Sequence, residues 1–293
     1  HKAMETQALL PSEYTQAESA DLDARIAVRK RQLGERLCIL GHHYQRDEVI
    51  KFADFTGDSL KLSQLAAGQS DAEFIVFCGV HFMAESADIV SSDQQKVILP
   101  NLHAGCAMAE MADVEDVSAA LEEICALTSE TVIPISYVNS TADIKAVTAR
   151  GGGACCTSSN VRNVFEWALA PTDKGGAGAG KIFCTPDQHL ARNTALAMGY
   201  PPEACCVYDP HLPCGGLTPQ DIENATFILW KGHCYVHQLF RAEHVAAVRE
   251  AHPGIRVIVH PECPREVVDL ADAAGSTAQI ITEIDAAAPG TKW

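Results

Sequence analysis

The 293-residue chain has no apolar run of the roughly 18 residues that a membrane-spanning helix needs. It also has no run of lysines and arginines longer than the three residues 29–31, and its formal net charge is −16. A nucleic-acid-binding protein needs a positive surface to replace the counterions of the phosphates, so nucleic acid is not expected as a partner. A small anionic substrate remains compatible, because a local pocket can be positive on an acidic protein.

A secretory signal is missing too, since the first residues show no charged-then-apolar pattern. Cysteine, in contrast, is abundant, with twelve in the chain. A secreted protein would pair them as disulfides, whereas a cytoplasmic protein keeps them as thiols or metal ligands. We therefore expect a cytoplasmic protein in which most single cysteines are small buried hydrophobic residues.

Short apolar runs alternate with segments of helical spacing along the chain. The runs, many of them rich in β-branched residues, are 38–40, 74–77, 97–99, 132–135, 181–183, 226–230 and 256–259. The helical segments include 21–36, 117–127, 160–168 and 238–251. Alternating strands and helices predict parallel sheets with crossover connections, and continuous apolar strands predict sheets covered on both faces. The sequence therefore predicts an α/β fold.

A long-period pattern divides these elements into three similar units. In the first two, a hydroxyl residue opens a helix (Ser59 or Ser158) and a later strand ends in a cysteine (Cys106 or Cys234). We predict a first unit at 21–112, a second at 113–237 with an insertion at about 170–219, and a third, incomplete unit at 238–293. Any α/β protein reuses strand–helix units, but the recurrence of serine and cysteine favours a true repeat. The third cysteine is expected beyond Trp293.

Polar side chains gather where the predicted strands end, which is where open parallel sheets bind ligands. The groups able to transfer protons or orient a substrate are His42, Tyr44, Tyr137, Asn139, His260 and Glu262. Hydroxyls near predicted helix starts, where free N–H groups hold phosphate or carboxylate, are Ser59, Ser158, Ser276 and Thr277. Taken singly, each could equally be a hydrogen-bonded loop residue or an ordinary helix cap.

Cys106 and Cys234 end predicted strands, and neither belongs to a CxxC pair. That spacing argues against a zinc ribbon or a ferredoxin. One thiolate from each of three units could instead hold a four-iron cluster with one iron open to act as a Lewis acid. Cys263 is the rival for the third ligand, although it does not share the strand-end position.

Ten segments, in order from about Leu37 to Gln279, resemble the quinolinate synthase family. They are Gly41-His42-His43-Tyr44-Gln45, Gly57-Asp58-Ser59-Leu60, Val80-His81-Phe82-Met83-Ala84-Glu85, Pro100-Asn101-Leu102-His103-Ala104-Gly105-Cys106, Tyr137-Val138-Asn139-Ser140, Thr157-Ser158-Ser159-Asn160, Pro186-Asp187, Gly232-His233-Cys234-Tyr235-Val236-His237, His260-Pro261-Glu262 and Gly275-Ser276-Thr277. The resemblance implies three similar three-layer α/β units with short parallel sheets around a pseudo-threefold axis, the third unit truncated, and an active site where the units meet. It also implies condensation of iminoaspartate with dihydroxyacetone phosphate to quinolinate, phosphate and water, in de novo NAD biosynthesis. The implied cofactor is a [4Fe-4S] cluster held by one cysteine per unit, of which Cys106 and Cys234 match two.

The same resemblance implies roles for the polar residues. His42 and Tyr44 lie beside the triose-derived part of the substrate, with Tyr44 assisting proton transfer, and Tyr137 and Asn139 orient intermediates. Four hydroxyls contact carboxylate and phosphate, namely Ser59, Ser158, Ser276 and Thr277. His237 contacts substrate, and His260 and Glu262 form an acid/base pair near the cluster.

The sequence leaves two alternative functions open. One is a zinc-dependent, aldolase-like lyase with His42, His237 and His260 as ligands, and the other is a thiol-rich interaction protein. Iminoaspartate is expected to arrive from an aspartate oxidase or dehydrogenase.

Overall fold

The computed structural model describes residues 10–293, which form two compact units, the first ending at Cys106 and the second running from Ala107 to Trp293. Within the described residues, no helix is both long and apolar enough to cross a membrane.

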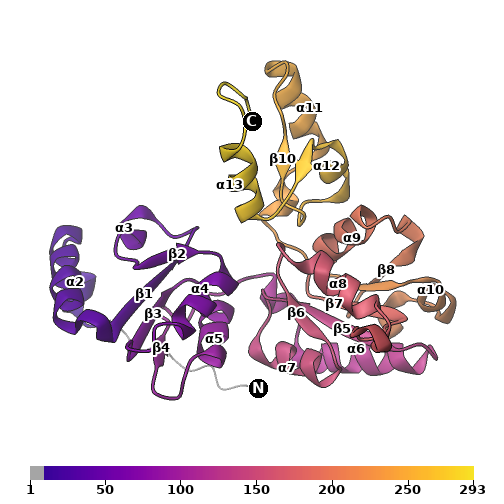
Figure 1. Cartoon of the computed structure of the whole chain (residues 1–293), viewed down its shortest axis with the longest axis horizontal. Helices are drawn as coiled ribbons and strands as arrows, with labels where there is room; N and C mark the ends of the chain where they lie inside the picture. Colours follow the sequence, from indigo (N-terminus) through magenta and orange to yellow (C-terminus); the bar gives the residue numbers. More distant parts are fainter. Residues whose placement is uncertain (1–9) are drawn as a thin grey trace. The chain divides into compact units, whose positions relative to one another are not determined.

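The first unit is a parallel four-stranded sheet with helices beside it (Figure 1). Its strands are β1 (Leu37–His42), β2 (Phe55–Gly57), β3 (Phe74–Cys78) and β4 (Lys96–Ile98), in the order β2-β1-β3-β4. Its helices are α1 (Ser12–Thr15), α2 (Ser19–Leu33), α3 (Asp47–Ile50), α4 (Ser59–Ala67) and α5 (His81–Val90). The central strands β1 and β3 carry fully buried side chains such as Leu40 and Phe77, which is why this sheet needs helices against it.

The second unit contains a parallel five-stranded sheet of order β6-β5-β7-β9-β8. Its strands are β5 (Val132–Tyr137), β6 (Ala154–Cys156), β7 (Lys181–Thr185), β8 (Cys205–Tyr208) and β9 (Phe227–Trp230). Its helices are α6 (Val114–Ala126), α7 (Ala142–Arg150), α8 (Val161–Leu169), α9 (Gln188–Ala197) and α10 (Pro219–Asn224). The range 170–219, expected to be an insertion, contains β7, α9 and β8.

A second, two-stranded parallel sheet completes this unit. It pairs β10 (Ile258–Val259) with β11 (Ala273–Ala274), and its helices are α11 (Ala242–Ala251), α12 (Arg265–Leu270) and α13 (Thr277–Asp285).

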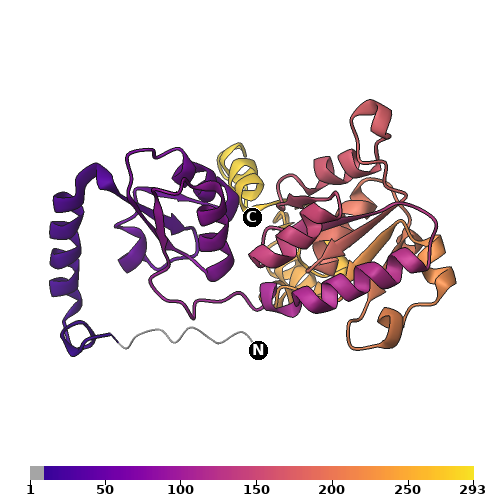
Figure 2. The same cartoon turned by 90° about the horizontal axis from the view of Figure 1, so that it is seen from below.

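Helices cover both faces of the five-stranded sheet. Helices α6 and α7 pack on one face, and α8 and α9 on the other (Figures 1 and 2). On the first face Ile124 and Ile144 join a buried cluster with Trp230, and on the second Phe165 packs on Phe227 with ring centroids 5.2 Å apart. These layers leave the carboxyl ends of the strands as the place where polar side chains can gather.

The predicted α/β fold with parallel sheets is confirmed. The pseudo-threefold arrangement and the bounds of the three predicted units stay predictions.

Candidate active site

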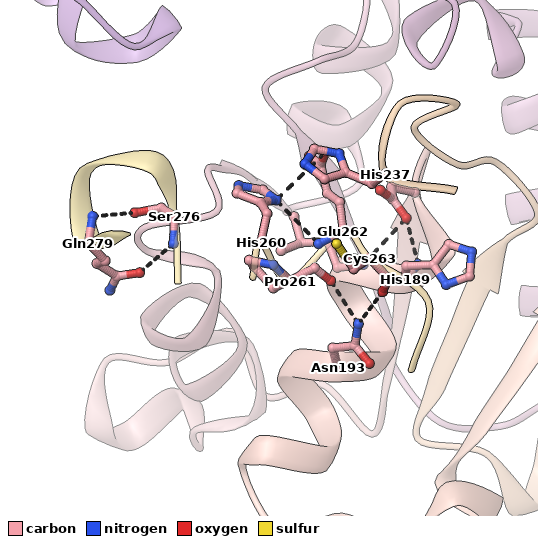
Figure 3. A network of polar contacts seen from close by, with 11 residues as sticks. His189, Asn193, His237, His260, Pro261, Glu262, Cys263, Ser276 and Gln279 are labelled. Atoms are coloured by element: carbon pink, nitrogen blue, oxygen red, sulfur yellow. Dashed lines mark hydrogen bonds and ion pairs between the residues drawn. The ribbon is translucent and has the colours of Figure 1, made fainter. Parts of the chain in front are cut away.

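Strand ends of the second unit bring an acid, two histidines and a thiol together. Cys234 and His237 follow β9, and His260 and Glu262 follow β10. The potential ligand atoms of Cys234, His237 and Glu262 all lie within 4.8 Å of one another. Figure 3 shows His237, His260 and Glu262 turned toward a common point. The sequence named all four residues, and the structure places them in one centre.

His237 is the cationic member of this centre. Its Nδ1 lies 2.9 Å from Oε2 of Glu262. Burial opposes a charge on the imidazole, but the interactions with Cys234 and Glu262 outweigh burial and raise the pKa of His237 to about 10. His237 therefore carries a proton next to a carboxylate and a sulfur.

Glu262 is 3% exposed, yet it is held as a carboxylate. Burial by itself favours the neutral acid, but the neighbouring His237 and His260 lower the pKa of Glu262 below its usual value. Nδ1 of His260 lies 3.8 Å from Oε2 of Glu262, and the His260 ring stacks on His237 with centroids 4.7 Å apart. Burial lowers the pKa of His260, which makes it the neutral partner of the two histidines.

Tyr137 closes the centre at the end of β5. Its side chain is buried and lies beside Glu262 and Ser158. Burial, and next the negative charge of Glu262, raise the pKa of Tyr137 well above its usual value, so its phenol keeps its proton. Asn139, two residues further on, is half-buried.

Asp187 is a buried acid of this region for which the sequence predicts no role. It is 3% exposed, and its Oδ1 caps α9 by accepting from the backbone N–H groups of His189 and Leu190. Its Oδ2 is buried without a hydrogen-bond partner among the described residues. Burial, and then Glu262, raise the pKa of Asp187 well above its usual value. Its position directly after β7 was the signal that could have singled it out.

The loop that carries Glu262 is fixed from helix α9. Nδ2 of Asn193 donates to the carbonyl oxygens of Pro261 at 2.8 Å and of Cys263 at 2.9 Å (Figure 3). Asn193 has no signal in the sequence, because its partners are backbone atoms 68 and 70 residues away. Cys263, the rival third ligand, is buried and is not among the grouped ligand atoms of Cys234, His237 and Glu262.

Two hydroxyl motifs of the second unit meet directly. Ser159 Oγ donates to Ser276 Oγ at 2.9 Å across 117 residues of sequence. Ser276 also forms a capping box with Gln279 at the start of α13, where Thr277 is the first helical residue (Figure 3). The motifs of Ser158 and Ser276 therefore lie side by side, as a shared anion site requires.

The remaining predicted residues lie in the first unit. His42 ends β1 and is 7% exposed, whereas Tyr44 is 73% exposed, and their ring centroids are 4.6 Å apart. Burial, followed by the neighbouring His43, lowers the pKa of His42 to about 4. Ser59 is the buried first residue of α4, and Cys106 is half-buried at the end of the unit.

The donor set is compatible with a metal cluster. Cys106 and Cys234 are half-buried cysteines, and thiolates are the usual ligands of iron–sulfur clusters. The sulfur of Cys234 lies beside Glu262, whose Oε1 is buried without a hydrogen-bond partner in the described part of the chain. Cys234, His237 and Glu262 therefore fit a metal group.

A parallel α/β fold with buried acid/base groups beside a thiol at its strand ends defines a metal-compatible α/β enzyme. Residues 24–293 match the family model NadA, quinolinate synthetase A protein. The chain is 50% identical to quinolinate synthase of Bacillus velezensis over 97% of this chain and 75% of that protein. It is 51% identical to quinolinate synthase of Streptomyces coelicolor over 97% of this chain and 71% of that protein. It is 52% identical to quinolinate synthase of Geobacillus kaustophilus over 97% of this chain and 75% of that protein.

The chain belongs to the quinolinate synthase family and is an enzyme of NAD biosynthesis. The resemblance inferred from the ten sequence motifs is thus confirmed. No support for the zinc-dependent lyase comes from these comparisons.

Proposed function

We propose that the chain condenses iminoaspartate with dihydroxyacetone phosphate to quinolinate, phosphate and water at a site that includes a [4Fe-4S] cluster. The observation that carries this proposal is the grouping of Cys234, His237 and Glu262 within 4.8 Å in a member of the quinolinate synthase family. A thiol ligand and an acid/base pair at one place are what a metal-assisted dehydration needs.

Cys106 and Cys234 are the cluster ligands that we assign. When bound, the cluster supplies a Lewis acid that polarises a leaving oxygen. The other steps of the chemistry fall to the side chains of the chain itself.

Glu262 is the proton acceptor of the centre. Its buried carboxylate is kept ionised mainly by the charged His237, which makes it available to take a proton from carbon or nitrogen. His237 holds a proton at Nδ1 and can return one to a departing hydroxyl. His260 keeps Glu262 and His237 in position, and Tyr137 and Asn139 orient the intermediate.

The anionic groups of the substrates are assigned to the hydroxyl motifs. Ser158 and Ser276 belong to two motifs joined by the Ser159–Ser276 hydrogen bond, and Thr277 opens α13, where free N–H groups favour an anion. Ser59 offers the same arrangement at the start of α4.

His42 and Tyr44 act on the triose-derived part. A neutral His42 at neutral pH is a hydrogen-bond partner without a charge, and the exposed phenol of Tyr44 is accessible to a substrate to which it can transfer a proton. Iminoaspartate comes from an aspartate oxidase or dehydrogenase, and the cytoplasm is the proposed location.

The test is an anaerobic purification of the full-length protein, followed by iron and sulfide analysis, visible absorption and an assay with both substrates. Four irons per protein, a brown colour and quinolinate formation are expected. A colourless protein that forms no quinolinate under these conditions would contradict the proposal.

A further inference from the structure

The donor atoms around Glu262 are of three chemical kinds. Cys234 offers sulfur, His237 a ring nitrogen and Glu262 a carboxylate oxygen, all within 4.8 Å of one another. Three such ligands plus one water is the ligand count of an open zinc site, whose bonds are about 2.0–2.3 Å long. Mg²⁺ and Ca²⁺ prefer sites made of oxygen alone, so the sulfur and nitrogen favour zinc.

Two acidic oxygens of this region lack a partner among the described residues. Glu262 Oε1 and Asp187 Oδ2 are both buried and have no hydrogen-bond partner among residues 10–293. Leaving such a buried oxygen unpaired is costly, so a ligand that satisfies one of them is favoured.

A second layer of contacts already orients the donors. His260 stacks on the His237 ring at 4.7 Å and lies 3.8 Å from Glu262, and Asn193 fixes the Glu262 loop through two backbone carbonyls. Such outer contacts hold ligands in place before a metal arrives.

We propose that Cys234, His237 and Glu262 form a Zn²⁺ site whenever the iron–sulfur cluster is not assembled. Zinc binding sends any proton on the ligand nitrogen or sulfur to solvent, and no electron is transferred. Because Cys234 cannot serve two metals, bound zinc excludes the cluster. That exclusion rests on the proposed cluster role of Cys234, whereas zinc binding itself does not.

The experiment uses the full chain, stripped of cluster and metal under reducing, oxygen-free conditions, and titrated with Zn²⁺ against a coloured chelator. One zinc per chain is expected. Replacement of zinc by Co²⁺ should give a tetrahedral cobalt spectrum with a sulfur-to-metal charge-transfer band that Cys234→Ser abolishes. A stoichiometry well below one, or a cobalt spectrum without the sulfur band, would overturn the proposal.

Matched variants identify the ligands. Glu262→Gln and His237→Gln should each weaken zinc binding about tenfold or more. Cys263→Ser changes a cysteine next to Glu262 that is not in the group, and His244→Gln changes an exposed histidine at the start of α11, so both should keep the affinity. Circular dichroism confirms folding of each variant. Zinc binding that survives Glu262→Gln and His237→Gln but is lost in Cys106→Ser would show a site made of cysteines and refute this ligand set.

A final arm separates this inference from the proposed function. Zinc-loaded protein is incubated with iron and sulfide without oxygen, and cluster formation is followed by visible absorption. Protein loaded with zinc should stay nearly colourless, whereas Glu262→Gln treated in the same way should take up cluster. Zinc binding is measured without substrate, so a protein that binds zinc but makes no quinolinate contradicts the proposed function alone.

Discussion

Nδ1 of His237 and Oε2 of Glu262 lie 2.9 Å apart, although one residue follows β9 and the other follows β10. This ion pair joins the carboxyl end of the five-stranded sheet to that of the two-stranded sheet. Each partner holds the other in its charged form despite burial. Removing either one leaves a buried group without its counter-charge, which is costly.

Glu262→Gln and His237→Gln are therefore expected to reduce kcat for quinolinate formation at least about 100-fold, because each removes a proton-transfer group. The measurement is turnover at matched iron content, since a change in cluster loading would imitate a catalytic defect. His244→Gln, at an exposed helix start, serves as the control and should keep full turnover. Variants of Glu262 and His237 that retain more than a third of wild-type kcat would contradict the assignment.

Much of the fold followed from the sequence, and the strands that it missed share a position. The seven predicted apolar runs correspond to β1, β3, β4, β5, β7, β9 and β10. The missed strands β2, β6, β8 and β11 all lie at sheet edges. An edge strand has one neighbour and is short, so it needs no continuous apolar run, and Phe55-Thr56-Gly57 in β2 is an example.

The site could be predicted only in part, for a different reason. Tyr137 ends β5, and His260 and Glu262 follow β10. The carboxyl ends of parallel strands are where ligand-binding and catalytic side chains are expected. Asn193 acts on backbone carbonyls far away in sequence, and a helical asparagine gives no sign of such partners. A contact between side chains of distant loops, such as Ser159 with Ser276, likewise depends on packing that a one-dimensional pattern does not contain.

Ser276→Ala should weaken both folding and substrate binding. It removes the capping box of α13, worth about 1 kcal/mol, and the partner of Ser159. Thr218→Ala removes the same kind of capping box from α10 and should cost a similar free energy of unfolding. Only Ser276→Ala should raise KM, about tenfold, in steady-state assays with either substrate varied. An equal rise of KM in Thr218→Ala would show that the effect comes from stability.

Asp187→Asn should stabilise the protein at neutral pH. The amide keeps the oxygen that caps α9 and removes an acid whose pKa is raised by burial and by Glu262. The pKa of Asp187 in the folded protein lies above its unfolded value of about 4. As pH rises above about 4, the unfolded chain therefore loses its proton more readily than the folded protein, and the wild type becomes less stable. Asparagine does not ionise, so the variant lacks this loss. The gain, measured by urea unfolding, should therefore be present at pH 7 and vanish near pH 3.

The comparison for Asp187 is Asp113, which caps α6 from an exposed position. Asp113→Asn should change the unfolding free energy by no more than a few tenths of a kcal/mol at pH 7, since asparagine and aspartate are similar caps. Asp187→Ala loses the cap as well and should be about 1–2 kcal/mol less stable than Asp187→Asn. If Asp187→Asn unfolds more easily than wild type at pH 7, Oδ2 of Asp187 has a stabilising partner, and the predicted gain is wrong.

His42 should make the first unit sensitive to acid. Burial lowers its pKa to about 4, below the unfolded value of about 6.5. Between about pH 6.5 and 4, His42 is protonated in the unfolded chain but not in the folded protein. The folded protein is therefore destabilised as pH falls through this range, and the loss is complete below about pH 4. The full difference corresponds to about 3 kcal/mol.

His42→Gln removes this proton linkage, so its unfolding free energy should fall less steeply than that of the wild type between about pH 6.5 and 4. The control is His103→Gln, which replaces an exposed histidine of the same unit and should follow the wild-type pH dependence. Urea unfolding at several pH values, read by a probe confined to the first unit, gives the comparison. Parallel curves for His42→Gln and wild type would mean that His42 takes up its proton in the folded state as easily as in the unfolded chain. That result would contradict the lowered pKa of His42, although an imidazole with an ordinary pKa of about 6.5 would still be mostly neutral at pH 7.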